Sequence, residues 1–595
     1  MPGTASQVYV DGTPTNGSNP WIDSLVWGGA WSDTPGLSTT GGPVTISYSA
    51  VSGADPYNVL NGAAMSWSSA GLTALGNALA AWEAVASLDF VQSANGAADV
   101  WIWQGTSAAA DGALGWSEIP AYSQGEPLYV VFNGQDPSWS STGLAVGGYG
   151  YITLIHELGH LLGLAHPHDG GSAGDGNIFP GVSAAFGDYG DYNINQGIFT
   201  TMSYNDGWGS QYPSHSDVGY GWQASPMALD IAAIQAVYGA NTTYASGSST
   251  YTLASYNAAG TYWSCIWDTG GTDLITNAGS ARSCTINLTA APLSGVNAGG
   301  YVSYASGIVG GYTIANGVLI ENATGGSGND LITGNSAANV LDGGAGADAL
   351  TGGAGNDTMD GGADTDVAVF SGTQSAYRFA FDGSLLIVTG PDGTDRLSNI
   401  ETLSFNSGND ISINSLIGTG TIEEVMSVQT GGVTTKIIPS IYSGPVSWIK
   451  YEMLGNTASD VIVGTSKNDF INLMGGDDAA NGGAGDDVLD GGTGSNFLTG
   501  GAGRDDFFLD GRGGTTTWAT ITDWSAGERL SVWGWRPGVS KVQWVDSAGA
   551  PGWTGVTMHG DLDGNGVIDT SVTWTGQNRS QLPTPLEYDG LLWFT

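Results

Sequence analysis

The chain has 595 residues and a formal net charge of −43, with 12 lysines and arginines against 55 aspartates and glutamates. This length predicts several domains with their own cores. The acidic balance makes nucleic acid and anionic membrane surfaces poor partners and divalent cations good ones. No Lys or Arg precedes Arg282, and no apolar run approaches the length of a membrane helix.

Residues 1–20 are predicted to be a short propeptide or leader. The opening MPGTASQVYVDG has neither a basic stretch nor an apolar core, so it does not resemble a Sec signal. Farther along, residues 72–86 have helical apolar periodicity, whereas residues 98–105 and 128–133 are predicted strands.

HELGHLLGLAHPH, residues 156–168, holds four of the six histidines. His156 and His160 lie four residues apart and share one helix face, as two ligands of one metal must. Gly163 permits the positive φ that ends a helix and returns His166 toward the metal. Three nitrogens leave the fourth zinc position open, which is typical of a catalytic site, and Glu157 lies beside it.

FTTMSY follows, with Met202 and Tyr204. Together with H-E-x-x-H-x-x-G-x-x-H, it resembles the metzincin proteases and, through M-S-Y, their serralysin branch. The resemblance implies that Met202 packs beneath the histidines. It also implies that Tyr204 ligates the resting zinc and later hydrogen-bonds the tetrahedral intermediate. Residues 21–245 would then be an α+β metzincin catalytic domain with a twisted sheet, long helices and a cleft. We expect residues 112–116 to bind extended substrate by β-addition.

Other segments extend the resemblance. Residues 224–241 resemble the helix that closes the serralysin catalytic domain, with Pro226 suited to the first turn. WDTGGTD, with Asp268 and Asp273, resembles the family's calcium-binding entry to its β-domain, within a transition spanning 246–324. His168 stands where the family usually has Gly, and we expect a solvated loop residue rather than a fourth ligand.

Two blocks of nine-residue units, 325–369 and 455–508, match the calcium-binding RTX pattern. Each glycine-rich half can present carbonyl oxygens, the sixth residue supplies a carboxylate, and the eighth points inward from a short strand. Two units would complete one turn of an all-β parallel β-roll, and the strict phase argues against a disordered linker. The predicted calcium ligands are Asp330, Asp348, Asp357, Asp366, Asp460, Asp469, Asp478, Asp487 and Asp505, with Asn339 and Asn496 replacing the acid in two units.

The remaining segments, an insert at 370–454 and a C-terminal region at 509–595, are predicted to be β-rich. DLDGNGVID resembles an EF-hand loop, but Val572 occupies the place of the bidentate glutamate, so a calcium site and a plain turn both remain open. Its candidate ligands are Asp561, Asp563, Asn565 and Asp569. For Cys265 and Cys284, a disulfide and two buried thiols are equally compatible with the sequence.

The RTX resemblance implies type I secretion machinery as a partner and an uncleaved C-terminal signal. Residues 587–594 are acidic and then apolar, as such tails are, although a final strand fits equally. We therefore expect a bacterial protein that is secreted, extracellular or associated with the cell surface or its surface-layer proteins. Scarce calcium inside the cell would keep the repeats unfolded for export.

These motifs predict a secreted zinc endopeptidase with one catalytic Zn²⁺ and several structural Ca²⁺ ions. Glu157 would act as general base on extended polypeptide substrates, and zinc with Tyr204 would stabilise the oxyanion. The alternative is a calcium-binding surface or structural RTX protein with a vestigial protease domain, but such a protein would be expected to have lost Glu157 or a ligand. The sequence is compatible with two biological roles for such an enzyme: general nutrient proteolysis and processing of the cell's own RTX surface proteins.

Overall fold

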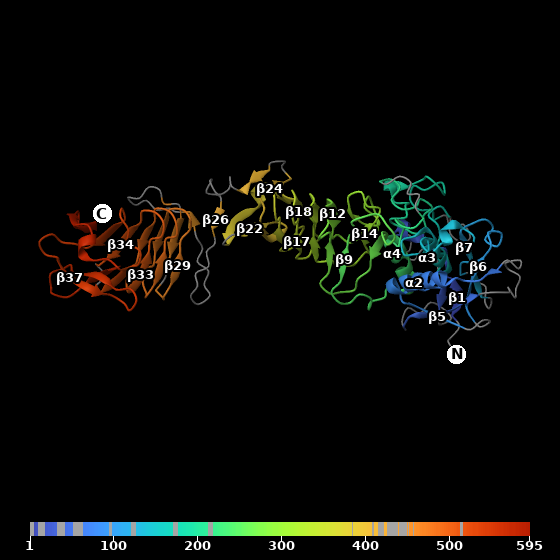
Figure 1. The fold of residues 1–595 in the computed structure, drawn as a ribbon, viewed down its shortest axis with the longest axis horizontal. Coiled ribbons are helices and arrows are strands. Elements are labelled where there is room, and N and C mark those ends of the chain that lie inside the picture. Colours follow the sequence, from blue (N-terminus) through green and yellow to red (C-terminus); the bar gives the residue numbers. More distant parts are fainter. Residues whose placement is uncertain are drawn as a thin grey trace. The chain divides into compact units, whose positions relative to one another are not determined.

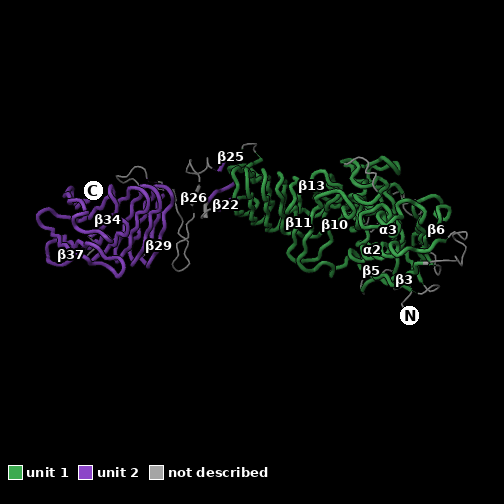
Figure 2. Tube along the Cα trace, in the orientation of Figure 1, with its two compact units in different colours: residues 1–376, 390–411 green, residues 377–389, 412–595 purple. Residues whose placement is uncertain are grey.

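The computed structural model forms two compact units, residues 1–376 with 390–411, and residues 377–389 with 412–595 (Figure 2). The part of the chain that it describes comprises residues 5–9, 18–32, 42–51, 64–93, 98–120, 127–169, 177–211, 218–382, 385–406, 410–413, 422–424, 438–439, 449, 451–455, 457–511 and 516–595. Residues 1–4 and 10–17 of the predicted leader at 1–20, and parts of the insert at 370–454, lie outside these ranges. Each unit is described by itself.

A six-stranded sheet forms the N-terminal part of unit 1 (Figure 1). Its strands are β3 Val44–Val51, β4 Ala64–Met65, β5 Leu88–Gln92, β6 Val100–Gly105, β7 Gly115–Ser117 and β8 Leu128–Asn133. β5, β3, β6 and β8 run parallel in that order, and β7 is antiparallel at the edge beside β8. The two strands predicted at 98–105 and 128–133 are therefore confirmed. A separate ribbon pairs β1 Ser6–Tyr9 with β2 Gly29–Ser32.

Helices accompany this sheet. They are α1 Pro20–Asp23, α2 Ser69–Val85, α3 Tyr149–Leu161 and α4 Ala228–Tyr238, with short 3₁₀ turns at Pro137–Trp139 and Asp191–Asn193. α2 confirms the helix predicted at 72–86. Its Ser68 side chain caps the helix by accepting the Gly71 N–H at 3.0 Å. Trp82 in α2 is fully buried and donates its indole N–H to Ile155 O in α3 at 3.2 Å, which ties the two helices together.

α4 confirms the predicted closing helix, but Pro226 lies outside its first turn because Met227 is the N-cap. Asp230 fixes this end of the helix by accepting the Met227 N–H at 2.9 Å. A carboxylate in the first turn also interacts favourably with the helix dipole. The capping residue, rather than the proline, therefore sets where α4 begins.

The rest of unit 1 is a parallel β-roll of two facing sheets (Figure 1). One sheet runs β10 Trp263–Ile266, β14 Gly311–Ile314, β13 Ser303–Ala305, β12 Cys284–Asn287, β16 Leu331–Thr333, β18 Ala349–Thr351, β20 Val367–Phe370 and β24 Thr402–Phe405. The other runs β9 Thr250–Thr252, β11 Leu274–Thr276, β15 Asn322–Thr324, β17 Val340–Asp342, β19 Thr358–Asp360 and β23 Gly393–Ser398.

The nine-residue phase explains this roll. Ile332 is paired with Leu350, and Leu341 with Met359, so each turn advances by two nonapeptides as predicted. The eighth position of every unit is buried between the sheets, and of its neighbours on the strands only Val488 is buried as well. Gly353 shows why the turns need glycine: its φ is +100°, and a Cβ would collide with the carbonyl of Asn335 in the turn before.

Unit 2 contains the second roll. Its first sheet runs β27 Ile438–Pro439, β28 Tyr451–Leu454, β30 Asp469–Asn472, β32 Val488–Asp490, β34 Asp506–Asp510, β36 Arg529–Trp533, β41 Leu591–Phe594 and β40 Leu586–Tyr588. The second runs β29 Val461–Val463, β31 Ala479–Asn481, β33 Ser495–Thr499, β35 Thr517–Ile521, β39 Thr570–Thr575, β38 Gly555–Asp561 and β37 Lys541–Ala548. Other short elements of the chain are β21 Arg378–Asp382, β22 Leu385–Gly390, β25 Ile411–Ser412, β26 Ile422–Glu424 and a 3₁₀ turn at Arg579–Gln581, and unit 1 has a further 3₁₀ turn at Gln374–Ala376.

The structure answers two questions that the sequence leaves open. The apolar end of the chain forms a strand: β41 pairs antiparallel with β36, and Leu592 and Phe594 are buried in the core of unit 2. Cys265 and Cys284 are both buried free thiols. No helix within the described ranges is both long and apolar enough to cross a bilayer.

Candidate metal centre

The end of α3 brings three histidines together. His156 and His160 lie one turn apart in α3, which ends at Leu161. Gly163 then takes a φ of +99°, as the sequence predicts, and a Cβ there would collide with the carbonyl of Gly29. This position therefore accepts only glycine, and the chain turns back so that His166 faces the helix.

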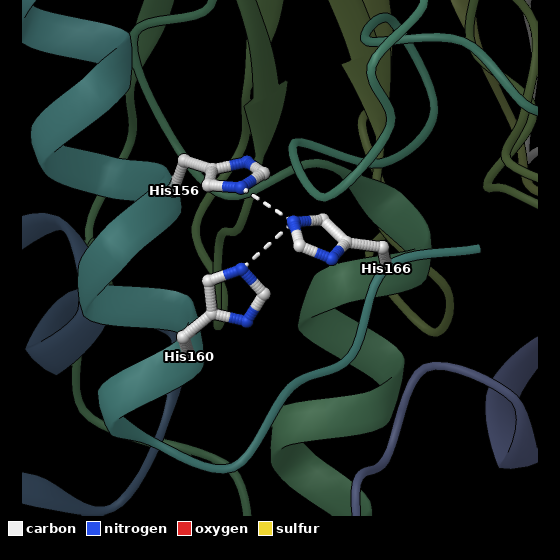
Figure 3. Close-up of side chains that lie close together, drawn as sticks. All are labelled: His156, His160 and His166. Atoms are coloured by element: carbon white, nitrogen blue, oxygen red, sulfur yellow. Dashed lines mark hydrogen bonds between the residues drawn. The ribbon is translucent and has the colours of Figure 1, made fainter. Parts of the chain in front are cut away.

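The Nε2 atoms of the three histidines converge on one point (Figure 3). His166 Nε2 lies 3.1 Å from His156 Nε2 and 2.9 Å from His160 Nε2. At these separations one ion can contact all three nitrogens, as tetrahedral zinc does in sites with three protein ligands.

Each imidazole also has an oxygen partner at its other nitrogen. His156 Nδ1 lies 2.8 Å from Thr201 O, and His160 Nδ1 lies 2.8 Å from Leu164 O. His166 Nδ1 lies 2.7 Å from Asp169 Oδ2. These acceptors hold the proton on Nδ1 and leave the Nε2 lone pairs free for a metal.

The electrostatics favour the neutral forms of His156 and His160. Burial lowers the pKa of His156 to about 3, and the neighbouring His166 contributes to the decrease. Burial also lowers the pKa of His160 well below its usual value. Neutral imidazole is the form that binds metal, so the protein environment and the requirement of the metal agree.

Glu157 lies beside the histidines in a cavity of about 310 Å³. The side chain is only 7 % exposed, and burial raises its pKa to about 8. Gly115 of the edge strand β7 lines the same cavity, where a Cβ would come within 3.0 Å of Glu157 Cγ. The predicted substrate segment at 112–116 is thus next to the carboxylate, and glycine leaves room there.

Met202 and Tyr204 come from the segment that follows. Met202 is fully buried, and a Cβ at Gly159 would come within 2.7 Å of its sulfur, so it packs closely against α3. The Tyr204 ring lies 4.5 Å from that of His166 and 5.9 Å from that of His156, measured between centroids. Burial, followed by the charge of Glu157, raises the pKa of Tyr204 to about 12, so it remains a hydroxyl donor.

Several residues at this centre were not found by sequence reasoning. Asp169 holds His166, and Asp230 accepts from Thr201 N at 2.7 Å and so fixes the carbonyl that holds His156. His168, expected to be a solvated loop residue, stacks on His166 with ring centroids 5.0 Å apart. Asp169, three residues after a predicted ligand, offered a local signal; Asp230 offered none, because only the fold brings α4 to this segment.

The sixth-position acids of the RTX units form a ladder. Asp348 Oδ1 accepts the Asp330 N–H at 2.7 Å, and Asp487 Oδ1 accepts the Asp469 N–H at 2.7 Å, eighteen residues away in each case. The second oxygen of most of these acids is buried without a partner among the described residues. Such oxygens are Asp348 Oδ2, Asp357 Oδ2, Asp366 Oδ2, Asp478 Oδ2, Asp487 Oδ2 and Asp505 Oδ2, and Asp273 Oδ2 of the predicted entry segment is buried in the same way. Buried anionic oxygens without donors fit Ca²⁺, which prefers oxygen ligands.

Three further acids extend the ladder outside the nonapeptide phase. Asp395 accepts from Asp357 N at 2.9 Å, Glu401 from Asp366 N at 2.8 Å, and Glu321 from Asp273 N at 2.8 Å. Because they occur at irregular spacing, the repeat pattern did not identify them. The other predicted entry residue, Asp268, instead accepts a hydrogen bond from the Tyr251 hydroxyl at 2.6 Å.

The EF-hand-like loop joins β38 to β39. Ligand oxygens of Asp561, Asp563 and Asp569 lie within 4.8 Å of one another. Asn565, however, donates to Asp563 at 2.9 Å, and Asp561 accepts the N–H groups of Gly564 and Gly566. A compact turn satisfied by its own backbone and a calcium site both fit this arrangement.

The fold and the centre define a chain with a three-histidine centre beside a buried glutamate, followed by RTX β-rolls. Residues 228–437 match the family "Peptidase M10 serralysin C terminal", and residues 454–489 and 481–511 match the "RTX calcium-binding nonapeptide repeat (4 copies)". These matches and the relatives below confirm the predicted relationship to serralysin-type RTX metalloproteases, and the RTX repeats indicate calcium.

Similar proteins include Serralysin C of Dickeya chrysanthemi, 40 % identical over 193 residues, which cover 31 % of this chain and 36 % of that protein. Metalloprotease AprA of Pseudomonas entomophila is 35 % identical over 228 residues, 36 % of this chain and 42 % of that protein. The structure of myroilysin matches at 19 % identity, over 34 % of this chain and 95 % of that one, with a TM-score of 0.20. The chain thus spans about two fifths of the length of the curated relatives it matches.

Proposed function

We propose that this chain is a secreted, calcium-stabilised zinc endopeptidase. The observation that carries the proposal is the convergence of three Nε2 atoms, whose Nδ1 partners are all oxygens, beside the buried carboxylate of Glu157. His156, His160 and His166 would hold the zinc, with Tyr204 close enough to join them. Bound zinc supplies Lewis acidity, which makes water a nucleophile near neutral pH and polarises a peptide carbonyl.

The protein residues would perform the remaining steps. Glu157 takes a proton from the attacking water and passes it to the leaving amine, because its carboxylate lines the cavity beside His156. Tyr204 donates its hydroxyl proton to the oxygen on which negative charge develops. The free edge of β7 pairs with an extended substrate and positions the scissile bond near Glu157.

In this proposal the RTX ladder binds Ca²⁺ and couples folding to it. Stacked acids repel one another in calcium-poor surroundings, so the rolls would remain unfolded inside the cell and order outside it. Export would use type I secretion machinery, with the signal in the C-terminal region at 509–595. Cell-surface association and the identity of the substrates belong to the same proposal.

The test compares wild type with Glu157→Ala. We expect both proteins to bind one zinc per chain, measured by metal analysis, and only wild type to hydrolyse casein. Loss of zinc binding in His160→Ala would serve as the matched control for the metal site. Wild-type turnover by Glu157→Ala would remove Glu157 from the mechanism. No turnover by zinc-loaded wild type on any protein substrate would favour the structural RTX alternative, and N-terminal sequencing of products would define the cleavage sites.

A further inference from the structure

The cavity beside the histidines has a second carboxylate, Asp206, besides Glu157. Asp206 follows Tyr204 by two residues, is exposed and lines the cavity. Its backbone position is fixed on both sides. Gly197 N donates to Asn205 O at 2.8 Å, and Ile198 N donates to Gly207 O at 2.8 Å. The turn that carries Asp206 is therefore held rigidly against the neighbouring segment.

No residue in the described ranges forms a hydrogen bond or ion pair with the Asp206 carboxylate. Asp206 does lie close to Tyr149 of α3: burial and then the Asp206 charge raise the pKa of that tyrosine to about 12. The carboxylate thus adds uncompensated negative charge to the wall of the substrate cavity. An unpaired charge beside a binding site attracts the opposite charge.

Gln223 supplies a second unsatisfied polar group to this cavity. The residue is 1 % exposed, and its Nε2 has no hydrogen-bond partner among the described residues. It lies next to the turn that carries Asp206, because a Cβ at Gly197 would collide with Gln223 Nε2 and approach Gly207 N within 2.7 Å. A buried amide without a partner is costly, so a ligand that bonds it gains affinity.

Among the α3 residues that line the cavity, Ile152 supplies an aliphatic surface. Ile152 is 6 % exposed and lines the cavity between Tyr149 and Glu157. A side chain that suits this wall has an aliphatic stem to pack on Ile152 and a charged head to reach Asp206. Lysine and arginine are the amino acids that combine the two features.

We propose that Asp206 is a specificity-determining residue that selects lysine or arginine at one of the two substrate positions flanking the scissile bond, with Gln223 assisting through its side-chain amide. This inference rests on the proposed endopeptidase function. Glu157 and the histidines define where the bond is cleaved, and Asp206 defines which side chain enters beside it.

The composition of the chain provides independent support. All 12 lysines and arginines lie at or beyond Arg282, so the catalytic half contains none. An endopeptidase that selects a basic residue would have no favoured site in its own catalytic half. The absence of cations there also leaves Asp206 without a competing internal partner, apart from histidine. A preference for basic substrate residues therefore explains both the charge of Asp206 in the cavity and the absence of Lys and Arg from the first 281 residues.

The experiment uses zinc- and calcium-loaded full-length protein at pH 8. Matched fluorogenic peptides carry lysine or its uncharged analogue norleucine, first before and then after the scissile bond. We expect wild type to cleave the lysine peptide of one pair with a kcat/KM at least about tenfold above the norleucine peptide. Asp206→Asn should reduce that ratio to near one, and Asp206→Glu should retain a preference. Asp89→Asn, which removes an exposed acid on β5, should leave the ratio unchanged.

A ratio measured on one preparation does not depend on how much of a variant is folded or loaded. A wild-type ratio near one in both pairs, or an Asp206→Asn ratio equal to that of wild type, would overturn the inference while leaving the peptidase intact. Absence of turnover on every peptide and on casein would instead contradict the proposed function itself.

Discussion

Replacing Asp487 by asparagine should change the stability of unit 2 in a way that depends on calcium. Asp487 Oδ1 accepts the Asp469 N–H, and its other oxygen is buried without a partner. Asparagine retains the first interaction and replaces the second oxygen with an amide donor. Asn496 already shows this arrangement: its Nδ2 donates to the carbonyl of Gly491, the first glycine of its own unit. Gly482 has the same place in the unit of Asp487.

The magnitude follows from the pKa of Asp487. It rises from 3.8 to about 8, first because burial disfavours the charge and then because Asp469 and Asp505 carry like charges. At about 1.4 kcal/mol per pKa unit, ionising this group at pH 7.5 costs the calcium-free fold at most about 5 kcal/mol. Because solvent screening and side-chain relaxation reduce that cost, we expect Asp487→Asn to stabilise calcium-free unit 2 by about 1–3 kcal/mol.

Calcium should reverse part of this gain. Loss of one carboxylate ligand should weaken calcium binding by about 10–100-fold. Saturating calcium would then stabilise the variant less than wild type, by about 1.4–2.7 kcal/mol per site. The two effects act in opposite directions, so the calcium-dependent increment in stability is the quantity to compare.

The assay is urea unfolding of the full chain in chelator and in millimolar calcium, followed by hydrogen exchange of peptides from residues 457–511. Asp546→Asn is the matched control, because it makes the same change at an exposed position of β37. Destabilisation by Asp487→Asn in chelator, or an increment equal to that of wild type, would show that Asp487 acts only as a hydrogen-bond acceptor in the ladder.

Four other results are expected. Tyr204→Phe should lower kcat by on the order of 10²-fold with little change in KM, since the hydrogen bond from the Tyr204 hydroxyl forms only in the transition state. An unchanged kcat in steady-state kinetics would mean that Tyr204 is only a packing residue or a ligand of the resting zinc. Deleting residues 586–595 should block export and, because β41 covers β36, also lower the urea midpoint of unit 2; normal secretion would place the signal upstream. In chelator, unit 2 should lose stability as pH rises from about 4 to 8. The folded-state pKa values of Asp487 and Glu528 are raised to about 8 and about 7, so protonation of these groups at low pH favours the folded state. Urea titrations in which stability increases with pH over this range would contradict the prediction. Trypsin should leave residues 1–281 uncut even after unfolding, which mass spectrometry of the digest would check.

The sequence predicted much of the candidate site because its geometry is local. Four-residue spacing on a helix places His156 and His160 on one face, and Gly163 reverses the chain within three residues of His166. The RTX rolls were equally predictable, since each nonapeptide repeats its own turn and its own inward residue.

The tertiary structure decided what depends on segments far apart in the chain. Asp230 reaches Thr201 only because α4 packs beside that segment, and no spacing in the sequence indicates it. Asp395 and Glu401 continue the ladder although they lie outside the repeats. The same holds for the cavity that joins Ile152, Asp206 and Gln223. Local spacing determines which groups can share a metal, whereas packing between distant segments determines which groups support the metal ligands and which face the substrate.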